Sequence, residues 1–216
     1  MIKIKKFVFN PFSENTYVLF DETRETVIID PGCSSLEEEE ELKSYIEKYH
    51  LKVLAVLNTH GHIDHVLGNQ FVTDTWSVKL GISKKDFPTY KAVSSYASNY
   101  GFQNYREVEP GFFLNEDDVF KFGESRLHVI FTPGHSVGHI VFINHEQQFV
   151  IGGDVLFNGS IGRTDLPGGD FDTLIESIQN KLFSLQDSFV VYSGHGAETT
   201  IGNEKVSNPF CRIEQE

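Results

Sequence analysis

Short apolar runs alternate along the chain with longer amphipathic stretches. Strand-like runs rich in β-branched and aromatic residues cover positions 16–20, 26–29, 53–57, 127–131, 140–143, 149–151 and 189–192, and helical patterns cover positions 65–76, 83–100 and 171–185. A further helix is expected after Ser35, because Ser35 with Glu38 three residues later forms the pattern of a capping box. Interleaved strands and helices predict an α/β fold rather than an all-β fold.

The chain shows no Gly/Ser linker and no low-complexity tract that would divide it. We therefore expect one domain over residues 1–216. Residues 83–111 look like a helical insertion with several tyrosines, and two interpretations stay open for it: a lid over a functional site, or a peripheral pair of helices.

Several of the expected strands run out into histidine or aspartate. The runs Val56–His62, Ile130–His135 and Val191–His195 each pass from apolar residues through a hydroxyl residue to Gly-His or a close variant, and two others end on Asp30 and Asp154. In α/β sheets the carboxyl ends of strands line the functional crevice. These side chains are therefore expected to converge.

The densest group of possible metal ligands is the run from His60 to His65. It places His60, His62, Asp64 and His65 within six residues. Alternate residues of an extended segment point the same way, so His60 and His62 can hold one ion together. Imidazole and carboxylate ligands without cysteine suit zinc, iron or manganese, and they favour an open catalytic site over a closed structural one.

These residues occur in motifs that resemble those of a known family. The run Thr59–His65, the stretch Thr132–His135, the stretch Gly152–Asp154 and the stretch Ser193–Gly196 match the metallo-β-lactamase-fold hydrolases in order and approximate spacing. Within that family the chain is most similar to the short glyoxalase II-like branch. The resemblance implies a four-layer αββα sandwich with two metal ions at one edge.

The resemblance also implies a role for each ligand residue. One ion would be held by His60, His62 and His135, and the other by Asp64, His65 and His195. Asp154 would bridge both ions, so Asp64 and Asp154 are the carboxylates expected at the reacting centre. Asp30 matches a position that supports the metal ligands from behind. Two divalent ions are implied, zinc first, with iron or manganese as alternatives.

The implied reaction is hydrolysis of a thioester such as an S-acyl-glutathione, a small-molecule substrate. The loop Gly162–Gly169 and the segments Glu198–Gly202 and Asn208–Phe210 resemble those of the short glyoxalase II-like proteins. We expect Arg163 and Asp165 either to pair and fix that loop or to contact the substrate. Only 21 residues follow His195, so the C-terminal helical domain that helps long glyoxalase II enzymes bind glutathione is not expected.

A second reaction class stays open. Persulfide dioxygenases share this fold and a similar Gly-Arg-Thr-Asp stretch. There a single iron uses positions that match His60, His135 and Asp154, a facial triad suited to oxygen chemistry. Those proteins keep the remaining ligand residues as well, so the ligands do not separate the two activities.

The charge and the remaining residues narrow the other options. A net charge of −13 disfavours nucleic acid as a partner. No apolar run is long enough to span a membrane, and the first residues do not resemble a signal peptide, so a cytoplasmic location is expected. The sequence leaves the oligomeric state open.

His139 is expected to be a polar loop residue outside the ligand set, and Cys33 a small buried filler.

Overall fold

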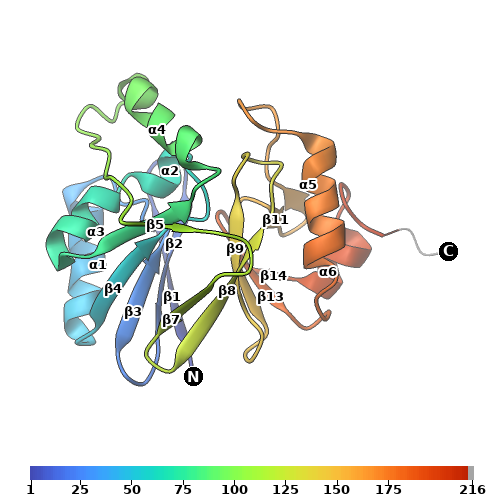
Figure 1. Ribbon diagram of the computed structural model, residues 1–216, viewed down its shortest axis with the longest axis horizontal. Helices are drawn as coiled ribbons and strands as arrows, with labels where there is room; N and C mark the ends of the chain where they lie inside the picture. Colours follow the sequence, from blue (N-terminus) through green and yellow to red (C-terminus); the bar gives the residue numbers. More distant parts are fainter. Residues whose placement is uncertain (214–216) are drawn as a thin grey trace.

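The computed structural model describes residues 1–213 and contains two six-stranded mixed sheets (Figure 1). Sheet one has the order β1-β2-β3-β4-β5-β6. Its strands are β1 (Lys3–Phe9), β2 (Glu14–Phe20), β3 (Glu25–Ile29), β4 (Lys52–Leu57), β5 (Lys79–Ser83) and β6 (Phe112–Leu114). The first three form an antiparallel meander, and β3 to β6 run parallel.

Sheet two has the order β14-β13-β10-β9-β8-β7. Its strands are β7 (Val119–Phe122), β8 (Ser125–Phe131), β9 (Ile140–Asn144), β10 (Phe149–Gly153), β13 (Val190–Ser193) and β14 (Thr199–Thr200). In this sheet β10 and β13 pair in parallel, and the other neighbouring strands pair antiparallel. A small hairpin, β11 (Leu156–Phe157) with β12 (Ser160–Ile161), connects β10 to the helices of this half.

Helices cover the outer face of each sheet. The helices α1 (Leu36–Lys48), α3 (Asn69–Trp76) and α4 (Phe87–Tyr96) pack on sheet one through buried residues that include Leu42, Val72 and Val93. The helices α5 (Phe171–Ser177), η2 (Ile178–Leu182) and α6 (Ile201–Ser207) pack on sheet two in the same way. Figure 1 shows the two helical layers on opposite sides. The expected αββα sandwich is confirmed.

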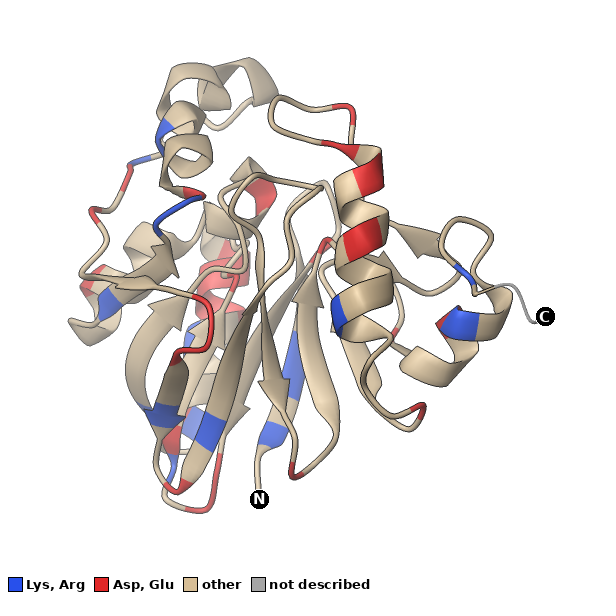
Figure 2. Cartoon of the chain, turned by 45° about the vertical axis from the view of Figure 1, so that its right-hand side comes forward, with Lys and Arg blue, Asp and Glu red and all other residues tan. Residues whose placement is uncertain are grey.

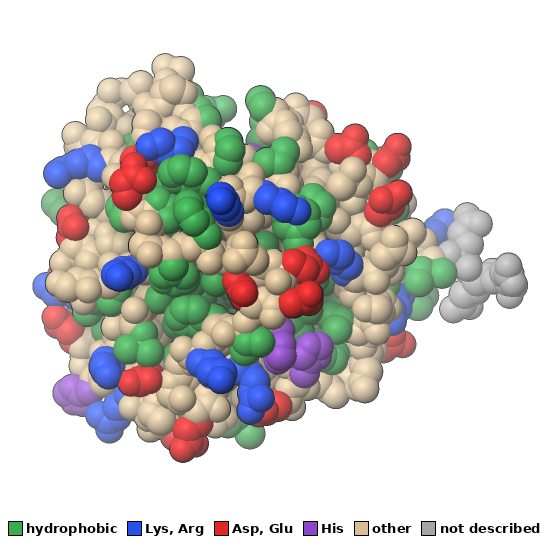
Figure 3. Space-filling model, in the orientation of Figure 1, with side chains coloured by type: hydrophobic (Ala, Val, Ile, Leu, Met, Phe, Trp, Pro, Cys, Tyr) green, Lys and Arg blue, Asp and Glu red, His purple; other side chains and the backbone are tan. Residues whose placement is uncertain are grey.

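The space between the two sheets is filled by alternate residues of both. Tyr17 and Leu19 from sheet one meet Val129 and Phe142 from sheet two, all buried. Along a strand every second side chain faces the same side, so these positions fill the central layer while their neighbours face the helices. At the open edge, where β6 and β7 lie, the rings of Phe112 and Phe120 stack with centroids 6.0 Å apart. Figure 3 shows hydrophobic side chains gathered across the middle of one face of the molecule.

Two local predictions can be compared with the structure. The capping box at Ser35 is confirmed, because its hydroxyl accepts from the Glu38 N–H and the Glu38 carboxylate accepts from the Ser35 N–H. The helix expected over 65–76 is instead two helices, α2 (Ile63–Val66) and α3. They separate at Gly68, whose N–H bonds the Pro31 carbonyl at 2.7 Å and where a Cβ would lie 2.3 Å from the Cys33 sulfur.

The helical stretch over residues 83–111 connects two parallel strands. It contains α4 and the short helix η1 (Ala97–Tyr100), and it leads from β5 to its parallel neighbour β6. Parallel neighbours require a crossover connection, and helices usually provide it. The segment is therefore the crossover of the layered fold between β5 and β6.

Charged residues are distributed over many elements. In Figure 2 acidic positions lie along α5, whereas Lys and Arg positions are spread over strands and helices of both halves. Within residues 1–213, no helix has the length and apolarity needed to cross a membrane.

Candidate metal centre

The residues expected to bind metal lie in loops at one end of the sandwich. The loop between β4 and α2 carries His60 and His62, and α2 itself carries Asp64 and His65. The other three follow strands of sheet two: His135 after β8, Asp154 directly after β10, and His195 after β13. Two sheets thus contribute to one site, and the side chains that follow the strand ends converge as expected.

His60, His62 and His135 form a first cluster. Nδ1 of His62 lies 2.8 Å from Nε2 of His135, which lies 3.2 Å from Nε2 of His60. All three side chains are buried. Three ring nitrogens that face one another this closely suit a shared cation.

Asp64, His65 and His195 form a second cluster. Oδ2 of Asp64 lies 3.2 Å from Nε2 of His195 and 3.7 Å from Nε2 of His65. His65 is fully buried, whereas about a quarter of the His195 side chain is exposed. This cluster therefore faces the solvent side of the centre.

Asp154 lies between the two clusters. Its Oδ2 is 3.5 Å from Nε2 of His135 in the first cluster and 3.5 Å from Nε2 of His195 in the second. Its Oδ1 is 3.3 Å from Nε2 of His65. One carboxylate is thus within reach of both groups of imidazoles.

Hydrogen bonds behind the clusters determine which nitrogen of each ring is free. Thr59 donates its hydroxyl hydrogen to Oδ2 of Asp30 (2.6 Å), so its oxygen accepts from Nδ1 of His60, 3.0 Å away. Nδ1 of His65 lies 3.2 Å from the same Asp30 oxygen and donates to it. Asp30 also accepts the Thr59 N–H at 2.7 Å. Nε2 is therefore the nitrogen that both His60 and His65 direct toward the centre.

Backbone carbonyls do the same for two further rings. Nδ1 of His135 donates to the Arg163 carbonyl at 2.7 Å, and Nδ1 of His195 faces the carbonyls of Phe12 and Ser13 at 3.2 and 3.3 Å. A carbonyl can only accept, so each Nδ1 carries a hydrogen, and Nε2 is the nitrogen of each ring that can bind a metal ion. Outer hydrogen bonds that select the tautomer are typical of metal-binding histidines.

Burial and charge act differently on the two clusters. Burial lowers the pKa of His62 to about 3 and that of His60 well below its usual range, so both rings are neutral. Burial also lowers the pKa of His195, but the carboxylates of Asp154 and Asp64 outweigh it and raise that pKa to about 10. The acidic second cluster thus attracts positive charge.

The residues fit divalent metal ions. Nε2 of His65 and Oδ1 of Asp154 are buried, and neither makes a well-directed hydrogen bond within residues 1–213 although they lie 3.3 Å apart. A cation between them would satisfy both atoms. The donor set of imidazole nitrogens and carboxylate oxygens, without thiolate, suits zinc, iron or manganese.

A family model agrees with this geometry. The model described as the metallo-beta-lactamase superfamily matches residues 9–195, which include all seven residues of the two clusters and the bridge. The chain belongs to the metallo-beta-lactamase superfamily. It is therefore a member of a hydrolase superfamily whose fold binds divalent metals.

Curated and structural relatives agree with this assignment. Hydroxyacylglutathione hydrolase GloC of Haemophilus influenzae is 39% identical over 205 residues, which cover 92% of this chain and 93% of that protein. The crystal structure of TTHA1623 in a di-iron-bound form is 34% identical, with a TM-score of 0.86 and coverage of 95% and 99%. The structure of the BLEG-1 B3 metallo-beta-lactamase is also 34% identical, with a TM-score of 0.82 and coverage of 97% and 99%.

In this superfamily member His139 is a loop residue outside both clusters, as expected, but it is not at the surface. It is fully buried, and its ring lies 4.8 Å from that of His60 at an interplanar angle of 23°. Its Nε2 accepts the backbone N–H of Asp154 at 3.1 Å. The only signal in the sequence was its spacing of four residues from His135. Position alone could not distinguish it from an exposed histidine.

Two buried carboxyl groups near the superfamily's metal loops were also missed. Asp86 accepts backbone N–H groups from two ligand loops. Glu14 is fully buried, 3.9 Å from Nδ1 of His65, and burial raises its pKa well above the usual range. Neither residue lies in a motif with histidine, so no local pattern pointed to them.

The entrance to the centre carries aromatic and charged side chains. Phe12 and Tyr100 are exposed, with ring centroids 6.0 Å apart, and the Phe157 ring lies 6.2 Å from that of His195. Arg163 and Asp165 form a paired contact through two hydrogen bonds of 2.7 and 2.8 Å, so the expected pairing is confirmed. The pair closes the loop on which the Arg163 carbonyl holds His135.

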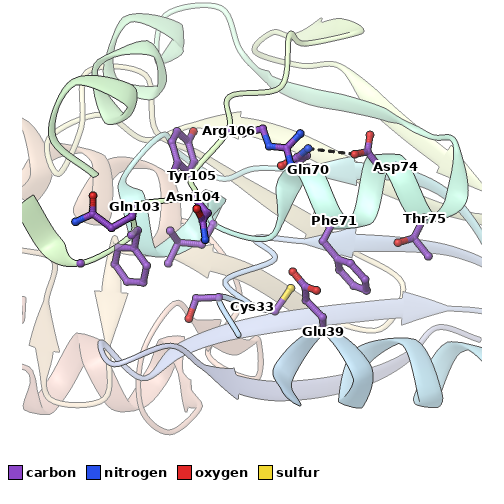
Figure 4. A pocket seen from close by; sticks show the side chains of 14 residues that line it. Cys33, Glu39, Gln70, Phe71, Asp74, Thr75, Gln103, Asn104, Tyr105 and Arg106 are labelled. Atoms are coloured by element: carbon purple, nitrogen blue, oxygen red, sulfur yellow. Dashed lines mark hydrogen bonds between the residues drawn. The ribbon is translucent and has the colours of Figure 1, made fainter. Parts of the chain in front are cut away.

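A separate cavity lies away from the metal clusters. It has a volume of about 390 Å³ and lies between α1, α3 and residues 101–106 (Figure 4). Cys33, Glu39, Phe71 and Arg106 are among its lining residues, and no residue of the two metal clusters is. Cys33 is buried and its thiol is free, which agrees with the expected filler role.

Proposed function

We propose that the chain is a metal-dependent thioesterase that hydrolyses S-acyl-glutathione or a similar thioester. The observation that carries the proposal is the position of Asp154 between two clusters of three ligand residues. His60, His62 and His135 would hold one divalent ion, and Asp64, His65 and His195 the other. The 39% identity to a hydroxyacylglutathione hydrolase supports the choice of substrate class.

Two bound divalent ions would supply Lewis acidity and water activated for attack at neutral pH. The protein's own contribution is positional and electrostatic. Asp64 and Asp154 together carry a charge of about −2 against the +4 of two ions, so the centre stays positive in an acidic protein and attracts an anionic substrate. Their oxygens can also accept a hydrogen bond from the attacking water and so orient it.

Departure of a thiolate requires little from the residues at the entrance. A thiolate has a parent pKa near 8.5, about seven below that of water, so its departure needs little help from a general acid. The exposed rings of Phe12 and Tyr100 offer an apolar surface on which the acyl chain can pack. Residues outside the clusters therefore need only bind and orient the substrate.

The direct test is hydrolysis of S-lactoylglutathione by protein loaded with zinc or with iron, followed through release of free thiol. We expect turnover well above background and its loss on chelation. D154N should lower kcat/KM by more than about 100-fold, the upper end of what removal of a supporting residue costs. H50A, which changes an exposed histidine outside the site, is the matched control. Absence of turnover with both metals would reject the proposal.

One observation favours a second candidate. Nε2 of His135 lies 3.2 Å from Nε2 of His60 and 3.5 Å from Oδ2 of Asp154, which brings together two histidines and one carboxylate. That set suits a single iron and a persulfide dioxygenase reaction. Oxygen uptake with glutathione persulfide, together with one tightly bound iron per chain, would favour this reaction over thioester hydrolysis.

A further inference from the structure

The start of α4 is inserted between the two loops that carry the first cluster. A Cβ at Gly61 would lie 2.5 Å from the backbone nitrogen of Tyr90, and a Cβ at Gly138 would lie 2.0 Å from that of Asp86. Neither loop can carry a side chain at its glycine without displacing the backbone of this helix start. The loop of His60 and His62 and the loop of His135 are therefore packed against the same few residues.

The Asp86 carboxylate connects these two loops. Its Oδ2 accepts the Gly61 N–H at 2.5 Å, and its Oδ1 accepts the Gly138 N–H at 2.9 Å. Gly61 lies between His60 and His62, and Gly138 lies between His135 and His139. Asp86 is fully buried, so water does not compete for these hydrogen bonds.

The position of Asp86 in its own helix explains why it is available. It is the N-cap residue of α4, where aspartate usually accepts an N–H of the first turn, yet it makes no such bond. Pro88, in the first turn, has no N–H to offer. The carboxylate instead points out of the helix toward the metal loops.

We infer that Asp86 is a positioning residue for the first metal ion: it sets the distance between the pair His60 and His62 and the third ligand, His135. This inference rests on the proposed metal centre. The two loops are separated by more than 70 residues in the chain, and the strands that precede them belong to different sheets. A carboxylate bonded to both loops therefore preorganises three ligands that no local turn could hold together.

The test compares D86N with wild-type protein by titrating zinc against a chromogenic chelator. Asparagine keeps the shape but has one acceptor oxygen, so one of the two N–H groups must lose its partner. We expect the affinity for the first metal ion, held by His60, His62 and His135, to fall about 10- to 100-fold, and the affinity for the second ion to change less. The cobalt-substituted protein should show an altered visible spectrum, which a purely structural role would leave unchanged.

D21N is the matched control. Asp21 is also a buried carboxylate that joins two separate turns, since it accepts the Glu124 N–H at 2.8 Å and the Thr23 N–H at 2.9 Å. It lies in the β2–β3 turn, at the opposite end of β3 from Asp30. D21N should lower thermal stability without changing zinc affinity. Unchanged affinity in D86N, or an equal loss in both variants, would overturn the inference.

Amide hydrogen exchange of the metal-free wild-type protein provides a test that requires no variant. The Gly61 and Gly138 amides should be strongly protected, and exchange as fast as that of free amides would overturn the inference. The zinc titration also separates this inference from the proposed function. Wild-type protein that binds no divalent ion would overturn both, whereas normal wild-type binding with normal D86N binding overturns the Asp86 role alone.

Discussion

The backbone N–H of Asp154 donates a hydrogen bond of 3.1 Å to Nε2 of His139. Nε2 of His139 therefore carries no hydrogen, and its Nδ1 faces the Thr132 hydroxyl at 3.3 Å. Asp154, which lies between the two clusters, is thus held through its backbone and not through its carboxylate. His139 thus supports the centre without being positioned as a ligand.

Replacing His139 tests this support. H139L leaves the Asp154 N–H buried without a partner, which should cost about 1–3 kcal/mol of unfolding free energy. Urea unfolding of the metal-free protein measures the loss separately from metal binding. H139Q supplies an acceptor oxygen on a flexible chain and should recover part of the loss. Equal stability of H139L and wild-type protein would contradict this role.

The contacts of Asp30 make a second prediction. D30N removes one acceptor from a group that serves Thr59 twice and His65 once, so the tautomer of His65 is no longer enforced. We expect zinc affinity to fall about 10- to 100-fold in chelator competition. Asp30 has φ of +50°, a conformation that asparagine tolerates, so the backbone is preserved.

D117N is the control for D30N. Asp117 also has positive φ, at +67°, but it is exposed and remote from the clusters in the β6–β7 connection. The two variants change charge and backbone preference alike. Similar zinc affinities for D30N and D117N would show that the Asp30 carboxylate does not support the ligands.

Metal removal should destabilise the fold. Ions that bind only the folded state stabilise it by about 4 kcal/mol when their free concentration is a thousandfold above Kd. Calorimetry should therefore show a lower Tm after dialysis against dipicolinate and recovery on addition of zinc. Calcium, which prefers oxygen ligands, should not restore the Tm. An unchanged Tm would argue against ion binding in the folded protein.

The two cysteines should be unreactive in the native protein. Cys33 and Cys211 are each about 1% exposed. Burial raises the pKa of Cys33 well above its usual range and that of Cys211 to about 12, so both thiols stay protonated at pH 8. Ellman's reagent should titrate two thiols in urea and almost none before unfolding. Rapid native labelling of either thiol would show that its surroundings open.

Much of the candidate site follows from local sequence. Strand-like runs that end in glycine and histidine or in aspartate indicate both the chemistry and its place at the strand ends, because strand periodicity and turn residues are local properties. The cap at Ser35 follows for the same reason. The break at Gly68 in the helix expected over 65–76 is different. Gly68 packs against Cys33, which is distant in the chain, so the local sequence does not reveal this contact.

The sequence by itself determined which residues could bind metal and which strands deliver them. Only the tertiary structure decided how they are held. Asp154 spans two clusters drawn from both sheets, His139 receives an amide from 15 residues away, and Asp86 joins amides 25 residues before it and 52 after it. A hydrogen bond between a side chain and a distant backbone amide leaves no periodic trace in the sequence. It depends on how the sheets and crossovers pack, so such contacts become visible only when the chain is folded.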